Sequence, residues 1–177
     1  MENVLNAAYV LAILSVIIMA TVAYENFYWR NKNPQKVYKL YEIFINTGLG
    51  FAYKLADGAA LAIYVFFFYD TIKDYGLELS TIDAWWTFPI IFIAVDFCFY
   101  LTHRTMHKVR WFWASHVTHH SGTRYNFSTA LRQNFTVVLN GAVLIWWIPL
   151  AFIGFDKHLV LAAMEVSLIY QFLLHTE

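Results

Sequence analysis

Charged residues are scarce in this chain, and neither sign prevails. They make up 14% of the 177 residues, with 12 Lys and Arg against 12 Asp and Glu. Nucleic-acid-binding domains present a basic surface, so this balance argues against a nucleic-acid partner. Only one cysteine is present, Cys98, and a single thiol excludes an internal disulfide framework. Because Cys98 stands in an apolar run, we expect it to be a small buried side chain.

Apolar residues dominate the composition instead. They account for 60% of the chain and aromatic residues for 20%, whereas soluble domains contain about 45–50% apolar residues. This excess predicts an all-α integral membrane protein with a single membrane-embedded domain over residues 1–177. A helix needs about 20 apolar residues to cross a bilayer. Five segments are candidate transmembrane helices, at residues 4–24, 44–69, 84–102, 135–155 and 158–174.

Most of the histidines lie in one short stretch after the third apolar segment. His103 and His107 form a first group, and His116, His119 and His120 form a second. Residues three and four apart share one face of a helix, so each group can direct its imidazoles at one centre. A lone histidine is more often structural, but imidazole is also the commonest protein ligand for iron, zinc and copper. The spacing therefore predicts a metal site formed by two neighbouring helices.

Lysine and arginine are unevenly distributed between the expected loops. Most of them follow the first and third apolar segments, whereas the opposite side carries only Lys73 and Lys157. The positive-inside rule places the basic loops in the cytoplasm and the N-terminus outside. Five crossings from that start bring both histidine groups, and also His175, to the cytoplasmic face of the membrane.

Several metals remain open at this stage. A structural zinc site would usually include cysteines, and the five imidazoles exceed what one tetrahedral ion needs, so two ions are the simpler reading. Haem with paired axial histidines is an alternative, although it would leave most of the five histidines without a ligand role. Asp96 lies within the third segment, seven residues before His103. We expect it either to orient a ligand histidine or to bond a neighbouring helix.

The two histidine groups, HRTMH at 103–107 and HVTHH at 116–120, resemble those of the fatty acid hydroxylase and sterol desaturase superfamily. The resemblance covers residues 96–134, and the segment YNFSTALRQ at 125–133 is similar to the alkylglycerol monooxygenase branch. Members are membrane non-haem di-iron enzymes. The resemblance thus implies two irons per site and dioxygen-dependent oxidation of a sterol, fatty acyl, ether or other membrane lipid. The electrons would come from an external donor, either tetrahydrobiopterin or a reductase with an electron-carrier protein.

The resemblance also extends the candidate site. It implies that His175 is an iron ligand alongside the five histidines above, and that Glu177 joins Asp96 as a candidate catalytic acid. Because the superfamily carries a third histidine cluster further on, we expect the chain to be truncated at its C-terminal end. Two alternatives stay open: a metal- or haem-binding membrane protein without oxygenase chemistry, and an inactive truncated member of the superfamily.

Overall fold

The computed structural model describes residues 2–36, 39–77, 86–122 and 124–175. All regular secondary structure in these ranges is helical, as the composition predicted. The elements are α1 (Glu2–Lys32), η1 (Pro34–Lys36), α2 (Leu40–Tyr64), η2 (Val65–Tyr69), α3 (Asp70–Asp74), α4 (Thr87–Lys108), α5 (Arg110–His120), α6 (Phe127–Ala130), η3 (Phe135–Asn140), α7 (Ala142–Ile153) and α8 (Lys157–Leu173).

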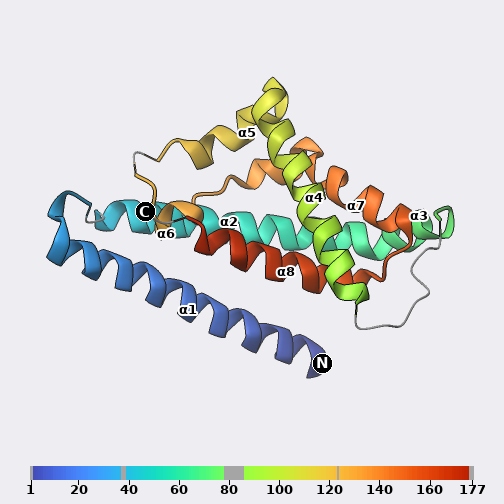
Figure 1. Ribbon diagram of the computed structural model, residues 1–177, viewed down its shortest axis with the longest axis horizontal. Helices are drawn as coiled ribbons and strands as arrows, with labels where there is room; N and C mark the ends of the chain where they lie inside the picture. The colour runs from blue at the N-terminus through green and yellow to red at the C-terminus, as the bar shows by residue number, and fades with distance from the viewer. Residues whose placement is uncertain (1, 37–38, 78–85, 123, 176–177) are drawn as a thin grey trace.

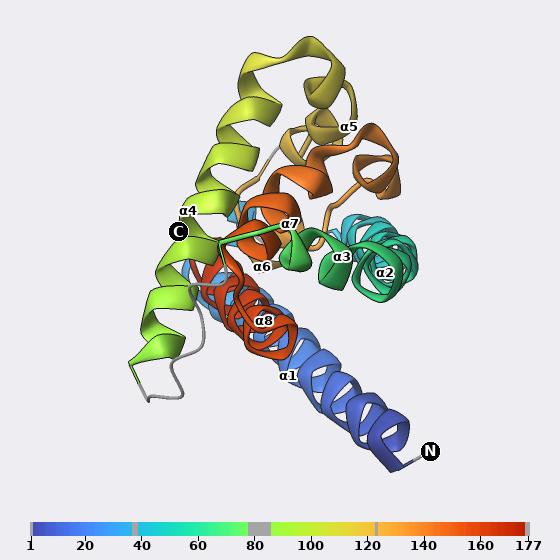
Figure 2. The same ribbon diagram turned by 90° about the vertical axis from the view of Figure 1, so that its right-hand side faces the viewer.

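Helix α4 is the centre of the packing. It contacts α5, α7 and α8 and crosses α8 in the view of Figure 1. Helix α2 packs against η2, α6 and η3, whereas α1 contacts mainly η1 and α6. Figure 2 shows the N-terminal part of α1 extending away from the other helices. The histidine-bearing helices are therefore held by other elements than α1: α7 and α8 contact α4, and η3 contacts α5.

The buried core lies where α4, α7 and α8 meet the end of α2. Helix α4 contributes Ile91, Val95 and Cys98, whose spacing of three and four residues puts them on one helix face. The Tyr69 hydroxyl donates a hydrogen bond of 3.1 Å to the carbonyl oxygen of Phe155, which ties η2 to the loop before α8. Cys98 is a free, buried thiol, so its expected burial is confirmed.

The predicted apolar segments agree with the helices in most places. Helix α1 contains the first segment, and α8 matches the fifth. The continuous helical run Leu40–Asp74, formed by α2, η2 and α3, contains the second. In the part of the chain that the structure describes, this run is the one helix long and apolar enough to cross a membrane. Helix α4 continues beyond the third segment, which ended at residue 102, and so includes His103 and His107.

The fourth predicted segment, 135–155, is not one helix. It is divided into η3 and α7 by Gly141, which has a φ of 83°. Glycine adopts this left-handed conformation without strain, and no helix continues through it. The 12 residues of α7 span about 18 Å at 1.5 Å per residue, well short of the hydrocarbon core of about 30 Å. Residues 135–155 are therefore not one continuous transmembrane helix.

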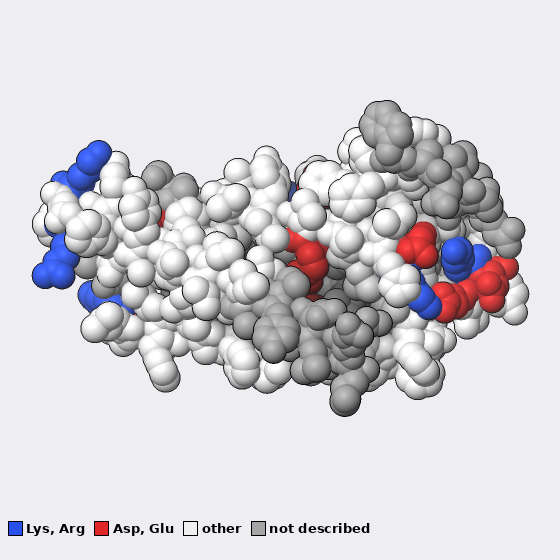
Figure 3. Space-filling view, turned by 90° about the horizontal axis from the view of Figure 1, so that it is seen from below, with Lys and Arg blue, Asp and Glu red and all other residues white. Residues whose placement is uncertain are grey.

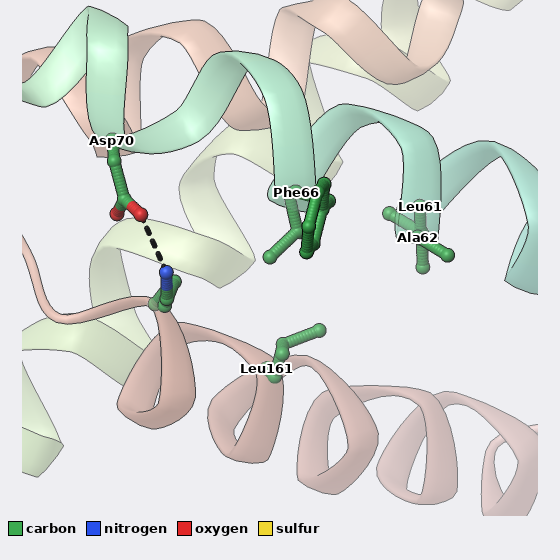
Figure 4. A pocket seen from close by; sticks show the side chains of 7 residues that line it. Leu61, Ala62, Phe66, Asp70 and Leu161 are labelled. Carbon is green, nitrogen blue, oxygen red and sulfur yellow. Dashed lines mark hydrogen bonds and ion pairs between the residues drawn. The ribbon is translucent and has the colours of Figure 1, made fainter.

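Two ion pairs link α2 and α3 to α8. Lys54 lies 3.7 Å from Glu165, and Lys157 lies 2.6 Å from Asp70. Between them is a shallow groove of about 450 Å³ with mainly apolar walls, which the Asp70–Lys157 pair closes at one end (Figure 4). In Figure 3, Lys and Arg gather where α1 meets α2, and charges of both signs gather over α3 and the start of α8. Between these ends the described surface is mostly uncharged and carries an acidic patch near its middle.

We expect Gly141→Ala to destabilise the protein by about 1–2 kcal/mol, because an L side chain in the left-handed region contacts its own carbonyl oxygen. A matched control is Gly58→Ala, since a Cβ at Gly58 also meets nothing within 4 Å but lies on a regular helix. Thermal unfolding in detergent should show a lower Tm for Gly141→Ala and an equal or higher Tm for Gly58→Ala. Equal effects of both changes would contradict the strain argument.

Candidate metal centre

Helices α4 and α5 bring five histidines into one region. His103 and His107 lie on the last turns of α4, and the other three lie on α5. Val109, with φ −104° and ψ 118°, is extended and separates the two helices. Because α5 contacts α4 after the turn at Val109, the two groups lie close together, and Figure 1 shows the two helices meeting at this turn. The predicted meeting of both groups is therefore confirmed.

His103, His107, His116 and His120 form one compact group. Their ligand nitrogens all lie within 4.8 Å of one another. The Nε2 atoms of His103 and His107 are 3.0 Å apart, and those of His116 and His120 are 3.1 Å apart. Two imidazoles bound at right angles to one ion, each at about 2.0–2.1 Å, have nitrogens about 3 Å apart. Each pair is thus spaced like neighbouring ligands of a single transition metal.

His119 and His175 form a second, smaller group. His119 belongs to α5, whereas His175 follows the end of α8, and their Nε2 atoms are 3.3 Å apart. The Nδ1 atom of His175 is 2.7 Å from the carbonyl oxygen of Gln171. The Nδ1 atom of His119 is 3.3 Å from the carbonyl oxygen of Arg132. The resemblance-based assignment of His175 to the site is consistent with this position.

The hydrogen bonds at Nδ1 set the direction of the free lone pairs. A carbonyl oxygen can only accept a hydrogen bond, so the Gln171 contact places the proton of His175 on Nδ1. His119 has two neighbours at Nδ1: the Arg132 carbonyl oxygen, at 3.3 Å, favours the same tautomer, whereas the Gln133 amide nitrogen, at 3.2 Å, favours the opposite one. With both protons on Nδ1, the two Nε2 atoms direct lone pairs at each other across 3.3 Å, an arrangement that a bound cation stabilises. Metal-binding histidines are usually oriented by such an Nδ1 contact.

Burial keeps these imidazoles neutral. Desolvation, assisted by the nearby His103, lowers the pKa of His116 to about 3. Desolvation also lowers the pKa values of His103 and His119 to about 4, and that of His120 below its usual range. A neutral imidazole keeps a lone pair for a metal at physiological pH. Imidazole donors without a thiolate suit iron, copper, nickel or zinc, so the residues fit a transition-metal site.

Aromatic side chains cover the four-histidine group. The ring of Trp113 lies 5.4 Å from that of His107 and 5.5 Å from that of His120. The Phe99 ring lies 5.7 Å from that of His103. His116 and His119 are buried, whereas His107 and His120 remain exposed. The group is therefore closed toward the protein interior and open on one side.

The two candidate acids are not placed against the histidines. Asp96 is exposed on α4, and seven residues correspond to about 10 Å along a helix. In the ranges that the structure describes, no hydrogen bond or ion pair joins Asp96 to a histidine, so the expected orienting contact is not formed. Glu177 lies outside the described residues. The catalytic role of either acid stays a prediction.

Sequence reasoning missed two contributors to the site. Gln171 lies one helical turn before His175, so this spacing could have predicted the contact between the Gln171 carbonyl oxygen and the His175 ring. Gln133 places its amide nitrogen 3.2 Å from Nδ1 of His119. No spacing rule could have found Gln133, because its contact depends on how the loop after α6 returns toward α5.

Comparisons with known proteins agree with this geometry. A family model described as fatty acid hydroxylase matches residues 88–177, a range that contains all six candidate ligand histidines. The chain is similar to the alkylglycerol monooxygenase of Xenopus tropicalis, with 36% identity over 120 residues, which are 68% of this chain and 25% of the relative. For the human alkylglycerol monooxygenase the identity is 40% over 95 residues, 54% of this chain and 21% of the relative.

The alkylglycerol monooxygenase of Caenorhabditis elegans is 39% identical over 101 residues, which are 56% of this chain and 19% of the relative. The chain thus spans about a quarter or less of the length of these curated relatives. No solved structure matches the chain.

We expect His116→Ala to weaken the binding of one transition-metal ion by at least tenfold, because groups that merely orient a ligand already contribute about 10–100-fold. His158→Ala is the matched control, since His158 is an exposed histidine at the start of α8. Anaerobic titration of the metal-free protein with Fe(II) or Co(II) measures both. Equal binding by the two variants would remove His116 from the metal site.

The metal-free protein should lose stability as the pH falls. His116, His119 and His103 have pKa values of about 3 to 4 when folded and about 6.5 when unfolded. Between these values the unfolded chain binds more protons, so stability present above pH 6.5 declines toward pH 4. Tm measured from pH 7.5 to 4.5 should fall, and His116→Gln should flatten the curve. A Tm that stays constant over this range would contradict the burial argument.

Proposed function

The chain belongs to the fatty acid hydroxylase family, and we propose that it is a non-haem di-iron monooxygenase that oxidises a membrane lipid. The observation that carries this proposal is the set of six histidines, divided into a group of four and a pair. The haem alternative fits poorly, because four imidazoles whose ligand nitrogens lie within 4.8 Å of one another leave no room for a porphyrin between them.

Each histidine group would hold one iron. His103, His107, His116 and His120 supply four nitrogens to the first, and His119 with His175 supply two to the second. Bound there, two ferrous ions would supply the activation of dioxygen, chemistry that side chains do not provide. The protein contributes neutral ligands, fixed tautomers and a site closed on its inner side. Trp113 and Phe99 cover the imidazole rings and limit the access of water.

The balance of the reaction requires an external donor. One lipid C–H bond, one dioxygen molecule, two electrons and two protons give one alcohol and one water. The electrons would come from a reduced pterin such as tetrahydrobiopterin, or from a reductase with a small carrier protein. The open side of the four-histidine group, where His107 and His120 are exposed, offers such a donor a path to the site.

We infer the substrate class from the name of the relatives and from the exposed surface of α2 and η2. Their printed name, alkylglycerol monooxygenase, points to an ether lipid for this chain too. Hydroxylation of the carbon beside an ether oxygen gives a hemiacetal, which separates into an aldehyde and an alcohol. Large apolar side chains are exposed on α2 and η2, as expected of a surface that contacts lipid tails. Phe44 is 81% exposed and Phe66 is 80% exposed.

We further infer a multi-pass membrane topology with the histidines on the cytoplasmic side. Helix Leu40–Asp74 is long enough to cross a bilayer, and the 22 residues of α4 reach about 33 Å. The lysines and arginines of the loops after α1 and α4 favour the cytoplasmic side for these loops. The site would then lie where a lipid head group and the first carbons of its chain meet the protein.

The test is oxidation of a 1-O-alkylglycerol by the purified chain in detergent, with Fe(II), ¹⁸O₂ and a reduced pterin. We expect one ¹⁸O atom in the aldehyde product. His116→Ala and His119→Ala should each reduce the rate by at least 100-fold, because each removes a ligand, and His158→Ala should stay within twofold. Product without ¹⁸O, or a rate that the ligand variants leave unchanged, would contradict the proposal.

A further inference from the structure

The segment 125–133 contains polar side chains that the histidine chemistry does not use. Arg132 is the most connected of them, and it reaches two other parts of the chain, the end of α5 and helix α2. We propose that Arg132 is a positioning residue, which orients His119 toward its metal and anchors this part of the site to helix α2. The proposal rests on the proposed function, because it concerns the metal held by His119 and His175.

The guanidinium of Arg132 binds the end of α5. Its Nε donates to the carbonyl oxygen of Thr118 at 3.1 Å and to Oγ of Ser121 at 2.9 Å. The last carbonyls of a helix lack intrahelical partners and carry partial negative charge, so a cation is favourable there. Thr118 directly precedes His119. The side chain of Arg132 therefore fixes the backbone from which His119 projects.

The same guanidinium is held from the other side by Asn46 of α2. Nη1 of Arg132 donates to Oδ1 of Asn46 at 3.0 Å, and Nδ2 of Asn46 donates to Oγ of Ser128 at 3.0 Å. Ser128 in turn donates to Oδ1 of Asn126 at 2.9 Å. Asn46, Ser128 and Asn126 are all buried. A buried amide with both ends bonded has one allowed orientation, so α2 determines where the Arg132 side chain lies.

The backbone of Arg132 completes the contact with His119. Its carbonyl oxygen is 3.3 Å from Nδ1 of His119 and selects the tautomer whose Nε2 is free to bind a metal. The Gln133 amide nitrogen, 3.2 Å from the same Nδ1, can only donate and would select the opposite tautomer. If the Arg132 carbonyl moves away, Gln133 becomes the remaining partner. The proton then moves to Nε2, where it blocks the metal.

A purely electrostatic role predicts something different. If Arg132 served only as one more positive charge at the membrane surface, any neighbouring arginine would be equivalent. Arg110 is the matched comparison, because it lies at the start of the same helix α5 and is exposed. Arg132→Gln and Arg110→Gln each remove one charge, but only the first removes the contacts to Thr118, Ser121 and Asn46.

The first readout is metal stoichiometry of the full chain, titrated anaerobically with Fe(II) alone. We expect two ions per wild-type chain, one per Arg132→Gln chain with the affinity of the retained ion unchanged within twofold, and two per Arg110→Gln chain. Arg132→Lys should regain part of the second ion, because an ammonium can reach some but not all of the three acceptors. Two ions bound by Arg132→Gln at wild-type affinity would overturn the role of Arg132.

The second readout needs no metal. The ¹⁵N shifts of the His119 ring in the metal-free protein report which nitrogen carries the proton. We expect Nδ1–H in the wild type and Nε2–H in Arg132→Gln, and an unchanged tautomer would overturn the proposal. If Arg132→Gln does not fold, Asn46→Ala gives the same decision, because it removes the α2 anchor of Arg132 together with the hydrogen bond to Ser128 and leaves the Arg132 side chain in place. If the wild-type protein binds no metal but Arg132→Gln still changes the His119 tautomer, the proposed function is contradicted and the positioning role is not.

Discussion

The whole arrangement depends on the mutual approach of six imidazoles. Their nitrogens lie 3.0 to 3.3 Å apart in pairs, and with the protons on Nδ1 the His119–His175 pair has two lone pairs facing each other. Burial lowers the pKa values of His103, His116 and His119 and so prevents protons from filling these gaps. Bound metal cations stabilise this arrangement best, because each nitrogen lone pair then binds a metal ion instead of facing another lone pair.

The other elements of the fold bring these histidines together and hold them in place. The reversal at Val109 turns α5 back onto α4, and α8 ends where its last turn can bring His175 to His119. A buried polar network around Asn46 and Arg132 connects the site to α2. The outer surface of α2 and η2 is apolar and exposed. A polar interior beside an apolar exterior is the arrangement expected of a catalytic site at a membrane surface, where each buried polar group needs a partner.

Local patterns explain what the sequence could predict. The composition predicted helices, which is confirmed. The i, i+3 and i+4 spacing predicted that the histidines gather at one centre, and this is confirmed for His103, His107, His116 and His120. Spacing could not show that His119 pairs with His175 instead, because His175 is brought there by tertiary packing. Hydropathy likewise could not reveal the left-handed Gly141 that interrupts residues 135–155. The sequence could not predict that Asn46 belongs to the polar network of the site, because a single amide in an apolar helix forms no pattern. The membrane orientation stays a prediction.

The most direct test of the account locates the metals. An iron-edge anomalous difference map of the iron-loaded protein, from crystals grown without chelator, would show every bound iron. The account predicts two peaks, one among His103, His107, His116 and His120 and one beside Nε2 of His119 and His175. A single peak within the group of four, or a haem signal elsewhere, would contradict the claim that the six histidines form two adjacent metal positions.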